Sequence, residues 1–468
     1  MRITLLNPLI PGTIQVHRLK TGHLGLAYVA ASLRSAGHDL RIIDAKVEEL
    51  ELDEIMARVK EHRPSIFGST AMTHEICEAA RVCAAVKRWD PTCVTVVGGP
   101  HGTALPERTL EEFPGVDAVI IGEGERSICE LADAVSASPK RSDWRSIAGI
   151  AFRDGEQIHT TDPRPLITDL DALPFPAWGL FPEQFAKPQV MASRGCPYRC
   201  AFCQRVLGGK VRLRSVDSVL AELDWLEERF GTRKHWFVDE TFGVNRKWTN
   251  ELLDKMQQRN ARKGYIWKWG ANSRVDLANE DLYRRMKEAG CLKLDFGVES
   301  GSQAMLDKIQ KGITLQRVRE AIAAANRVGL RTNAFFIIGH PGETWRTALQ
   351  TVRFAPRSGA KHIAVGLMVP YPGTEIWRMA RNGEGGYRLL TEDWQAYDKY
   401  FGNALELRSL SHRQLEFLQV LTYVWFYVRR GRFLDLLRFV RKFSRQAWAM
   451  IRRLIPKKRV PLAEREPE

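Results

Sequence analysis

The sequence predicts an α/β protein: a Rossmann-like domain with a doubly wound parallel sheet, then a partial (β/α)6 barrel, then a helical C-terminal region. The first 140 residues alternate short apolar runs with helical patterns, and a second alternating series follows a proline-rich linker. A chain of 468 residues is also too long for one ordinary core. We expect the Rossmann-like domain over 1–140, a hairpin and linker over 141–185, the barrel over 186–385 and the helical region over 386–468.

The N-terminal domain is predicted from apolar strand signals that read RITLLNP, DLRIIDA, SIFGSTA, CVTVVGGP and DAVIIGEGE. Between them lie the helical patterns LGLAYVAASLRSAG, ELDEIMARVKEH, THEICEAARVCAAVKRW and ALPERTLEEF, and this alternation favours a parallel sheet. In such sheets a ligand binds at the carboxyl ends of the strands, where glycines let the backbone approach it closely. The candidate binding residues at these ends are Ser69, Thr70, Gly98, Gly99 and Gly122.

A hairpin, a linker and the barrel follow in that order. The segment GIAFRDGEQIHTT predicts a hairpin with its turn at Asp154-Gly155, and PRPLITDLDALPFPAW predicts a linker. The barrel strands are expected at QVMASRG, KHWFVDETF, YIWKWGANSRVD, CLKLDFGVES, LRTNAFFIIGHPGE and KHIAVGLMVPYPGT, each followed by a helical segment. Polar residues gather at these strand ends, where barrel enzymes place their sites. From about Gly385 the strands are expected to stop and the chain to be helical.

Composition places the chain among ordinary globular proteins, with 44% hydrophobic and 27% charged residues. The N-terminus, MRITLLNPLIPG, lacks the features of a signal peptide, and the longest apolar run, near Phe417 to Val428, is too short to span a bilayer. We therefore expect a cytoplasmic protein. In that compartment, clustered cysteines indicate metal or redox chemistry rather than a disulfide framework.

The formal net charge of +15 is concentrated near the C-terminus. From Arg429 to Arg459, twelve Lys or Arg stand against one acid, Asp435, so this segment contributes +11. The rest of the chain is nearly balanced, and a nucleic-acid partner is not expected for it. From Phe433 to Leu454 the pattern predicts a basic amphipathic helix. This helix either packs on the barrel with a solvated basic face or lies on anionic lipid, and an RNA contact is the third interpretation.

Cys196, Cys200 and Cys203 lie together in the stretch SRGCPYRCAFCQ, directly after the first barrel strand. A structural zinc site uses four ligands, usually as two cysteine pairs, and this chain has no second pair; a catalytic zinc site with three ligands normally includes histidine. A four-iron cluster held by three cysteines leaves one iron open to a substrate or cofactor. The spacing, with Phe202 directly before the last cysteine, therefore favours an open 4Fe-4S cluster.

This CxxxCxxC motif resembles that of the radical S-adenosylmethionine family, whose members bind a 4Fe-4S cluster at the start of a partial barrel. The resemblance implies that the open iron chelates S-adenosylmethionine, and that one electron cleaves it to methionine and a 5'-deoxyadenosyl radical. It also implies that Glu240, in Asp239-Glu240-Thr241, holds the methionine amino group. The other residues implicated in binding this cofactor are Phe202, Asn272, Arg274, Glu299 and Ser300, with the segment IIGHPGE on the adenine side.

The segments VVGGPHGTALPE and IIGEGE resemble the cobalamin-binding domain that precedes many radical S-adenosylmethionine enzymes, so the resemblance covers about residues 1–385. It implies that cobalamin binds at the strand-end residues of the N-terminal domain. The sequence has no Asp-x-His-x-x-Gly motif, which supplies an axial histidine in some relatives, and most of this subclass also lacks it. His101 is accordingly interpreted as a loop histidine.

The resemblance predicts a cobalamin-dependent methyltransferase that acts on an unactivated carbon of a small molecule or lipid. One S-adenosylmethionine would methylate cobalamin, and a second would supply the radical. The first alternative is an oxidative cyclase or rearrangement enzyme with the same cofactors, because it shares every motif. The second is a tRNA methylthiotransferase, although the N-terminal cysteines lack the spacing of a second cluster. A non-enzymatic sensor would leave the polar strand ends of the barrel without a role.

Two partners are expected besides the substrate. A radical enzyme of this family needs a reductant such as flavodoxin or ferredoxin, and the basic C-terminal helix can place the protein at a membrane periphery. The identity of the substrate, the residues that transfer hydrogen and the oligomeric state do not follow from the sequence.

Overall fold

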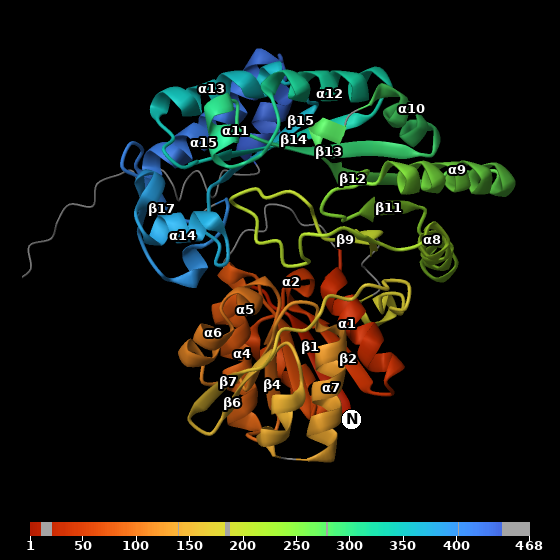
Figure 1. Cartoon of the computed structure of the whole chain (residues 1–468), viewed down its shortest axis with the longest axis vertical. Helices are drawn as coiled ribbons and strands as arrows, with labels where there is room; N and C mark the ends of the chain where they lie inside the picture. The colour runs from red at the N-terminus through yellow and green to blue at the C-terminus, as the bar shows by residue number, and fades with distance from the viewer. Residues whose placement is uncertain (11–20, 139, 183–187, 278, 401, 442–468) are drawn as a thin grey trace, which may run out of the picture.

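The computed structural model describes residues 1–10, 21–138, 140–182, 188–277, 279–400 and 402–441. Figure 1 shows two lobes, an N-terminal lobe drawn in red and orange and a second lobe drawn in green to blue, with the yellow segment running between them. Each lobe contains a sheet with parallel strands and helices packed on it, as the sequence predicts.

The sheet of the N-terminal lobe runs in the order β2-β1-β3-β4-β5-β6-β7. The strands β1 to β5 pair in parallel, whereas β6 and β7 form the predicted hairpin and extend the sheet in antiparallel fashion beyond β5. Because the chain turns to opposite sides after β1, the switch point lies between β1 and β3. The strand bounds are Arg2–Asn7, Asp39–Asp44, Ile66–Thr70, Val94–Gly98, Ala118–Ile120, Ile150–Asp154 and Gln157–Thr160 for β1 to β7.

Helices cover both faces of this sheet. The helices α1 and α7 contact each other and bury their apolar residues in one hydrophobic core, whereas α3 and α4 bury theirs in a second core on the other face. The apolar spacing of Leu24, Ala27, Tyr28 and Ala31 makes one side of α1 ready for burial. The helix bounds are Leu24–Ser35, Ala45–Glu48, Leu52–His62, Ile76–Trp89, Pro100–Ala104, Pro106–Glu112 and Gly124–Ala137 for α1 to α7.

The sheet of the second lobe runs β15-β14-β13-β12-β11-β8, with every neighbouring pair parallel. Its strands match the six predicted barrel signals, so the partial barrel is confirmed. The strand bounds are Gln189–Val190 for β8 and Lys234–Phe237, Lys268–Ser273, Cys291–Glu299, Arg331–Ile338 and His362–Leu367 for β11 to β15. The helix bounds are Val216–Phe230, Arg246–Lys263, Glu280–Glu288, Gln303–Lys308, Leu315–Arg327 and Trp345–Arg357 for α8 to α13.

The region after the barrel departs from the prediction in one respect. Two short strands, β16 (Tyr387–Leu389) and β17 (Leu405–Leu407), pair in antiparallel fashion, so strands do not stop near Gly385. Three-residue strands are too short to produce a period-two pattern, which is why the sequence did not reveal them. The helices α14 (Glu375–Arg381) and α15 (His412–Arg429) belong to this region as well.

The predicted basic amphipathic helix is described only at its beginning. Residues 433–441 are helical, and the remainder of the predicted segment, 442–454, lies outside the described residues. Among the helices that the structure describes, none combines the length and the apolarity that a transmembrane span requires.

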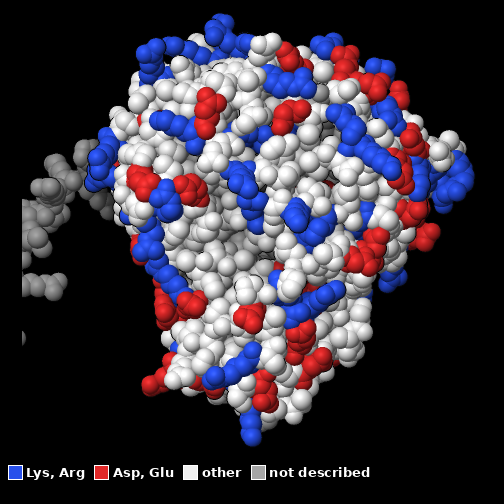
Figure 2. Space-filling view, in the orientation of Figure 1, with Lys and Arg blue, Asp and Glu red and all other residues white. Residues whose placement is uncertain are grey.

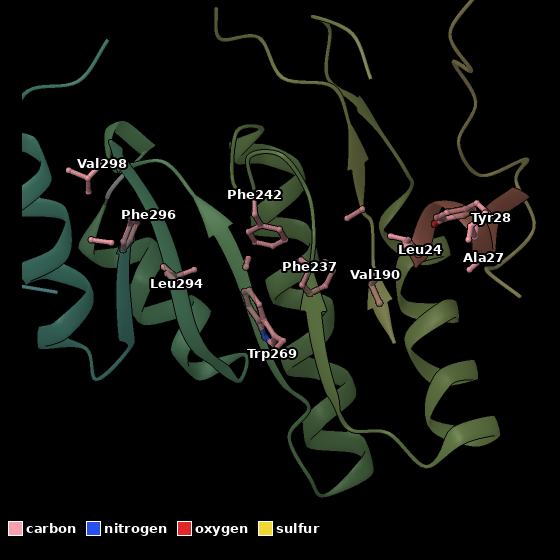
Figure 3. Packing of buried hydrophobic residues seen from close by; sticks show 14 of the residues in the cluster. Leu24, Ala27, Tyr28, Val190, Phe237, Phe242, Trp269, Leu294, Phe296 and Val298 are labelled. Atoms are coloured by element: carbon pink, nitrogen blue, oxygen red, sulfur yellow. The ribbon is translucent and has the colours of Figure 1, made fainter. Parts of the chain in front are cut away.

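The two lobes share a hydrophobic core. Figure 3 shows Val190, Phe237 and Trp269 on neighbouring barrel strands, with Leu24 and Tyr28 of α1 close to the strand that carries Val190. All five side chains are buried. Strands of a parallel sheet are buried on both faces, and for this reason nearly all of their residues are apolar. The lobes are therefore joined by buried apolar packing.

Candidate functional site

A cavity of about 320 Å³ lies at the carboxyl ends of the strands of the N-terminal lobe. Its lining includes all the residues predicted there, namely Ser69, Thr70, Gly98, Gly99 and Gly122. Apolar side chains from β1, β4, β5 and α7 line it further, among them Leu5, Val96, Ile120 and Ile128. The parallel topology thus gathers residues that are distant in sequence at the switch point, where such folds bind ligands.

Two neighbouring glycines serve this cavity in different ways. Gly99 has φ +99°, and a Cβ atom there would lie 2.9 Å from both the Ala71 oxygen and the Thr70 Oγ1, so the backbone path itself requires glycine. A Cβ atom at Gly98 would meet only the Cβ of Ile120, at 3.8 Å. Gly98 therefore leaves space in the cavity beside Ile120 rather than relieving strain.

His23 also lines this cavity, and sequence reasoning missed it. It caps α1, because its Nδ1 accepts the backbone N–H of Leu26 at 3.1 Å. Burial lowers the pKa of His23. Because Nδ1 accepts this hydrogen bond, the ring proton is on Nε2. The signal in the sequence was a histidine directly before the helical pattern LGLAYVAASL, a position that favours capping residues.

His101, in contrast, does not line the cavity. It is buried in α5 and makes an edge contact with Trp394, with ring centroids 4.9 Å apart. Burial lowers the pKa of His101 to about 4. The interpretation of His101 as a loop histidine is thus corrected, because the residue lies in the short helix α5, away from the cavity lining.

The cysteine loop lies between β9 (Ser193–Arg194) and β10 (Arg212–Leu213), an antiparallel pair. The Sγ of Cys196 lies 3.6 Å from Thr241 Oγ1, and the Sγ of Cys200 accepts from Arg274 Nη1 at 3.8 Å. Cys203 is exposed. Residues that follow β11 and β12 of the barrel, Thr241 and Arg274, therefore contact two of the three cysteines.

The donor set fits an iron–sulfur cluster in its chemistry. Among the described residues, no three or more histidine, cysteine, aspartate or glutamate side chains are gathered tightly enough to hold a metal ion. The three thiols nevertheless share one loop within eight consecutive positions. Thiolates without a histidine are the ligands that iron–sulfur clusters use.

The acidic pair after β11 divides into a structural and an accessible carboxylate. Asp239 is buried and accepts hydrogen bonds from the Ser193 hydroxyl and, at 3.2 Å, from the Ala192 N–H. Burial raises the pKa of Asp239 to about 6. Glu240 is exposed, and its carboxylate is hydrogen-bonded by the backbone of Gly195, one residue before the first cysteine. Glu240 is thus the carboxylate that a ligand of the cluster can reach.

A second cavity, of about 270 Å³, lies inside the barrel. Phe202 and Glu299 line it together with residues of β14 and β15. Glu299 has φ +69°, a conformation that non-glycine residues rarely adopt, and its Oε1 accepts from Lys311 Nζ at 2.7 Å. Such strain persists only where surrounding contacts hold it, and it clusters at functional sites.

The remaining predicted binding residues do not line either cavity. Arg274 pairs with Asp276 at 2.9 Å and stacks over the ring of Tyr198 at 3.5 Å, so it fastens the cysteine loop. Ser300 is buried directly after β13, and its Oγ lies 3.2 Å from Thr351 Oγ1. Asn272 is half-buried at the end of β12. Their roles toward a cofactor stay predictions.

A buried ion-pair network joins the two lobes, and sequence reasoning missed it. Glu123 accepts from Arg194 at 2.9 Å and from Arg212 at 2.8 Å, and Glu125 accepts from Arg194 at 2.6 Å. All four side chains are at most 9% exposed. Burial opposes ionisation of Glu123, but the bonds from Arg212 and Arg194 hold its pKa below the usual value.

The network fastens the cysteine loop to the first cavity. Arg194 stands two residues before Cys196, whereas Glu123 and Glu125 belong to the segment IIGEGE and line the cavity of the N-terminal lobe. Glu123 also accepts the backbone N–H of Ile167 in the linker at 2.7 Å. The glutamates of IIGEGE therefore hold the cysteine loop and the linker against the N-terminal lobe.

Further polar residues from both lobes lie in or beside the linings of the two cavities. Glu75 is buried, accepts from Lys46, and accepts the N–H of Met72, which lines the first cavity, at 2.9 Å. Tyr371 lines the second cavity. Burial raises its pKa, and the charges of Asp398 and Glu75 raise it further. Lys399 lines the second cavity too, and burial lowers its pKa.

Comparisons with known proteins identify a family domain in each lobe. Residues 14–132 match the B12 binding domain, and residues 190–355 match the radical SAM superfamily. Over 414 residues the chain is 36% identical to an uncharacterized methyltransferase, PH0819, of Pyrococcus horikoshii, which covers 87% of this chain and 88% of that protein. The chain belongs to the cobalamin-binding radical S-adenosylmethionine family.

Two further proteins are similar to this chain in sequence or in fold. It is 29% identical over 389 residues to the anaerobic magnesium-protoporphyrin IX monomethyl ester cyclase of Rubrivivax gelatinosus, covering 80% of this chain and 68% of that protein. The structure of the radical S-adenosylmethionine methyltransferase TsrM from Kitasatospora setae, with cobalamin and a 4Fe-4S cluster bound, superposes with a TM-score of 0.69 at 17% identity, over 86% of this chain and 82% of that one. The predicted order of Rossmann-like domain and partial barrel is confirmed.

Proposed function

We propose that this protein is a cobalamin-dependent radical S-adenosylmethionine C-methyltransferase that acts on an unactivated carbon of a small molecule or lipid. The observation that carries the proposal is the pairing of the glycine-lined cavity with the three-cysteine loop, joined by the buried contacts of Glu123. The 36% identity to a protein named as a methyltransferase supports the choice of reaction. The proposed division of labour places cobalamin in residues 1–140 and the cluster in residues 186–385.

When bound, the cluster supplies the electron that cleaves S-adenosylmethionine, and cobalamin carries the methyl group. The chain's own residues bind, orient and shield these groups. Cys196, Cys200 and Cys203 hold the cluster, and Arg274 keeps their loop in place through Tyr198. Arg274 also donates to the Cys200 sulfur, a contact that stabilises a thiolate.

Cofactor positioning falls to the accessible carboxylate and to the barrel cavity. Glu240 receives the amino group of S-adenosylmethionine as a charge-assisted hydrogen bond, because Asp239 is already engaged with Ala192 and Ser193. Glu299, held by Lys311, and the ring of Phe202 form the wall on the nucleoside side. The walls of both cavities are largely apolar, which excludes water around the reacting groups.

An oxidative cyclase with the same cofactors is the second candidate. The 29% identity to an anaerobic tetrapyrrole cyclase over most of this chain favours it specifically. The two reactions differ in the fate of the methyl group. A methyltransferase moves it to the product, whereas a cyclase uses the radical and leaves the methyl group in methionine.

Two proposals concern the surroundings of the enzyme. A low-potential reductant such as flavodoxin or ferredoxin is the electron donor that the cluster requires. Peripheral contact with a membrane through the basic C-terminal segment is the proposed setting, supported by the +11 charge of residues 429–459.

The test uses S-adenosylmethionine labelled in its methyl group. The full chain, reconstituted anaerobically with iron, sulfide and cobalamin and then reduced, is incubated with a small-molecule and lipid extract. Label that enters an extracted compound, together with 5'-deoxyadenosine, supports methyl transfer. Product formation with all label retained in methionine supports the cyclase instead. Absence of 5'-deoxyadenosine under every condition contradicts both.

A further inference from the structure

Exposed apolar side chains are concentrated on one part of the second lobe. Of the thirteen large hydrophobic residues that are exposed among the described residues, nine lie on the first turn of α13, on α15 and on the helix 433–441. We call these nine the apolar patch. They are Trp345, Phe417, Val420, Trp425, Val428, Phe433, Leu434, Leu437 and Val440. Soluble proteins rarely expose a contiguous set of this kind, and such sets mark interaction sites.

The helix α15 is apolar on two sides. One side, with Leu415, Leu418 and Phe426, is buried against the barrel. The opposite side carries Phe417 and Val428, which recur at helical spacing with Val420 and Trp425 and remain exposed. A helix that is apolar all round is normally buried on all sides. The outward side of α15 therefore lacks a covering element among the described residues.

The helix 433–441 continues the patch. A turn at Gly431, with φ +62°, joins it to α15, and Phe439 stacks on Tyr423 with ring centroids 4.6 Å apart. Its own apolar residues are the most exposed of the set, with Leu434 at 71% and Leu437 at 65%. The two helices form one hairpin with apolar side chains exposed on both.

Arginines lie beside the aromatic rings where α15 ends. The guanidinium groups of Arg429, Arg430 and Arg432 each lie 5.7 Å from an aromatic ring in the last turns of α15. One of these rings is that of the exposed Trp425. In contrast, Figure 2 shows acidic and basic side chains interspersed over the face it displays, with no continuous basic track.

We propose that this helical hairpin is a membrane-docking element that inserts its apolar patch into the interface of an anionic lipid bilayer. Apolar and aromatic side chains combined with arginines are the composition of helices that lie in a bilayer interface. The +11 charge of residues 429–459 complements an anionic surface, whereas it opposes the approach of a second copy of this chain. The element thus extends beyond the basic C-terminal segment to α15 and Trp345.

The hairpin lies next to the barrel cavity, which gives docking a functional consequence. Tyr423 accepts the N–H of Val365 in β15 at 2.8 Å, and Gln419 donates to the Val365 carbonyl at 2.9 Å. The neighbouring β15 residues Gly366 and Leu367 line the barrel cavity. Docking therefore places the bilayer beside the edge strand of the barrel. This consequence rests on the proposed function, and it favours a lipid-soluble substrate.

Vesicle sedimentation of the full chain tests the docking element. The probes are vesicles of phosphatidylcholine alone and vesicles of phosphatidylcholine mixed with phosphatidylserine. The patch variant carries Phe433→Ser, Leu434→Ser and Leu437→Ser, all at positions more than half exposed. The matched control carries Phe230→Ser, Ile266→Ser and Leu390→Ser, which are exposed residues outside the patch.

The wild-type chain and the control are expected to sediment with the phosphatidylserine vesicles, less so as salt rises. The patch variant is expected to lose at least about tenfold in partition, because three apolar side chains no longer enter the bilayer. Equal sedimentation of all three proteins overturns the proposal. The proposal is also overturned if the wild-type chain forms a dimer and does not bind vesicles, while the patch variant is a monomer. That result assigns the patch to a second copy of the chain. Cleavage of S-adenosylmethionine in vesicle-free buffer is expected to be the same in all three, so a failure of the chemistry is recognised separately.

Discussion

The cavity of the N-terminal lobe and the cysteine loop of the barrel differ in the groups that form them. The cavity depends on backbone paths and apolar walls, with Gly98 leaving space that any side chain would occupy. The cysteine loop depends on the functional groups of side chains, with Arg274 and Glu240 placed around three thiols. The first site is sensitive to added volume, whereas the second is sensitive to lost charge and lost sulfur.

Glu123 belongs to both sites at once. It lines the first cavity and holds Arg194 and Arg212 at the two ends of the cysteine loop. We therefore expect that changes within one site affect the binding of one cofactor, and that a change in the shared network affects the binding of both.

The largest expected effect is the loss of the cluster from a triple variant, Cys196→Ala, Cys200→Ala and Cys203→Ala. Because no thiolate remains on the loop, iron and sulfide are expected to be absent and S-adenosylmethionine cleavage to be abolished. Cobalamin binding is expected to persist, measured by corrin absorbance after gel filtration. The control is Cys129→Ser, outside the motif. Full cluster content in the triple variant would show that other residues hold the cluster.

The converse change is Gly98→Val. The new side chain fills the space beside Ile120 without backbone strain, so cobalamin binding is expected to be lost while the iron content is unchanged. Corrin absorbance and iron analysis on the same sample check both halves. Gly179→Val is the control, because a Cβ atom there has no neighbour within 4 Å and Gly179 lines neither cavity. Gly99 is less informative, since a side chain there also disturbs Ala71. Undiminished corrin binding by Gly98→Val contradicts the assignment of this cavity.

Glu123→Gln tests the bridge between the two sites. Buried Arg212 loses its ionised partner and Arg194 keeps only Glu125, and breaking a buried pair in this way costs about 3–5 kcal/mol of stability. Both cofactors are expected to bind more weakly, in contrast to the two variants confined to one site. The control is Glu375→Gln, whose pair with Arg378 is exposed, so its loss is expected to change stability little. Thermal unfolding and cofactor content measure the difference. Equal stability of the two variants contradicts the bridging role.

The smallest expected effect is that of Glu240→Gln. The variant keeps the shape of the side chain but removes its charge, so one charge-assisted hydrogen bond weakens and the affinity for S-adenosylmethionine falls about tenfold to hundredfold. Cluster content is expected to stay intact. Asp239→Asn is the matched comparison. It is expected to lower stability instead, because Asp239 is buried and bonded to Ser193 and Ala192. Unchanged affinity in Glu240→Gln moves the role to another residue.

Those parts of the site that follow from local pattern could be predicted from the sequence. The five strand-end residues of the N-terminal domain meet at one cavity because parallel strands bring their carboxyl ends to one edge. The cysteine spacing likewise identifies its loop without any knowledge of the fold. In both cases the information lies within a few neighbouring residues.

The parts that depend on long-range contacts could not be predicted. Glu123 and Arg194 are separated by 71 residues, and nothing in IIGEGE shows that its glutamates meet arginines across a lobe boundary. The lining role of His23 depends on the position of α1 relative to β3 and β4. The exposed side of α15 also escaped prediction, because an apolar run does not show which of its sides the barrel covers. The short strands β16 and β17 have too few residues to carry a pattern.

The central claim is that one chain holds two separate cofactor sites, one of sulfur ligands and one of backbone and apolar walls. Elemental analysis of the full chain, reconstituted anaerobically with iron and sulfide and supplied with cobalamin, tests this claim most directly. The account predicts about four iron atoms and about one cobalt atom per chain after gel filtration, with no zinc. Stoichiometric zinc in place of iron, or iron without retained cobalt, would contradict it.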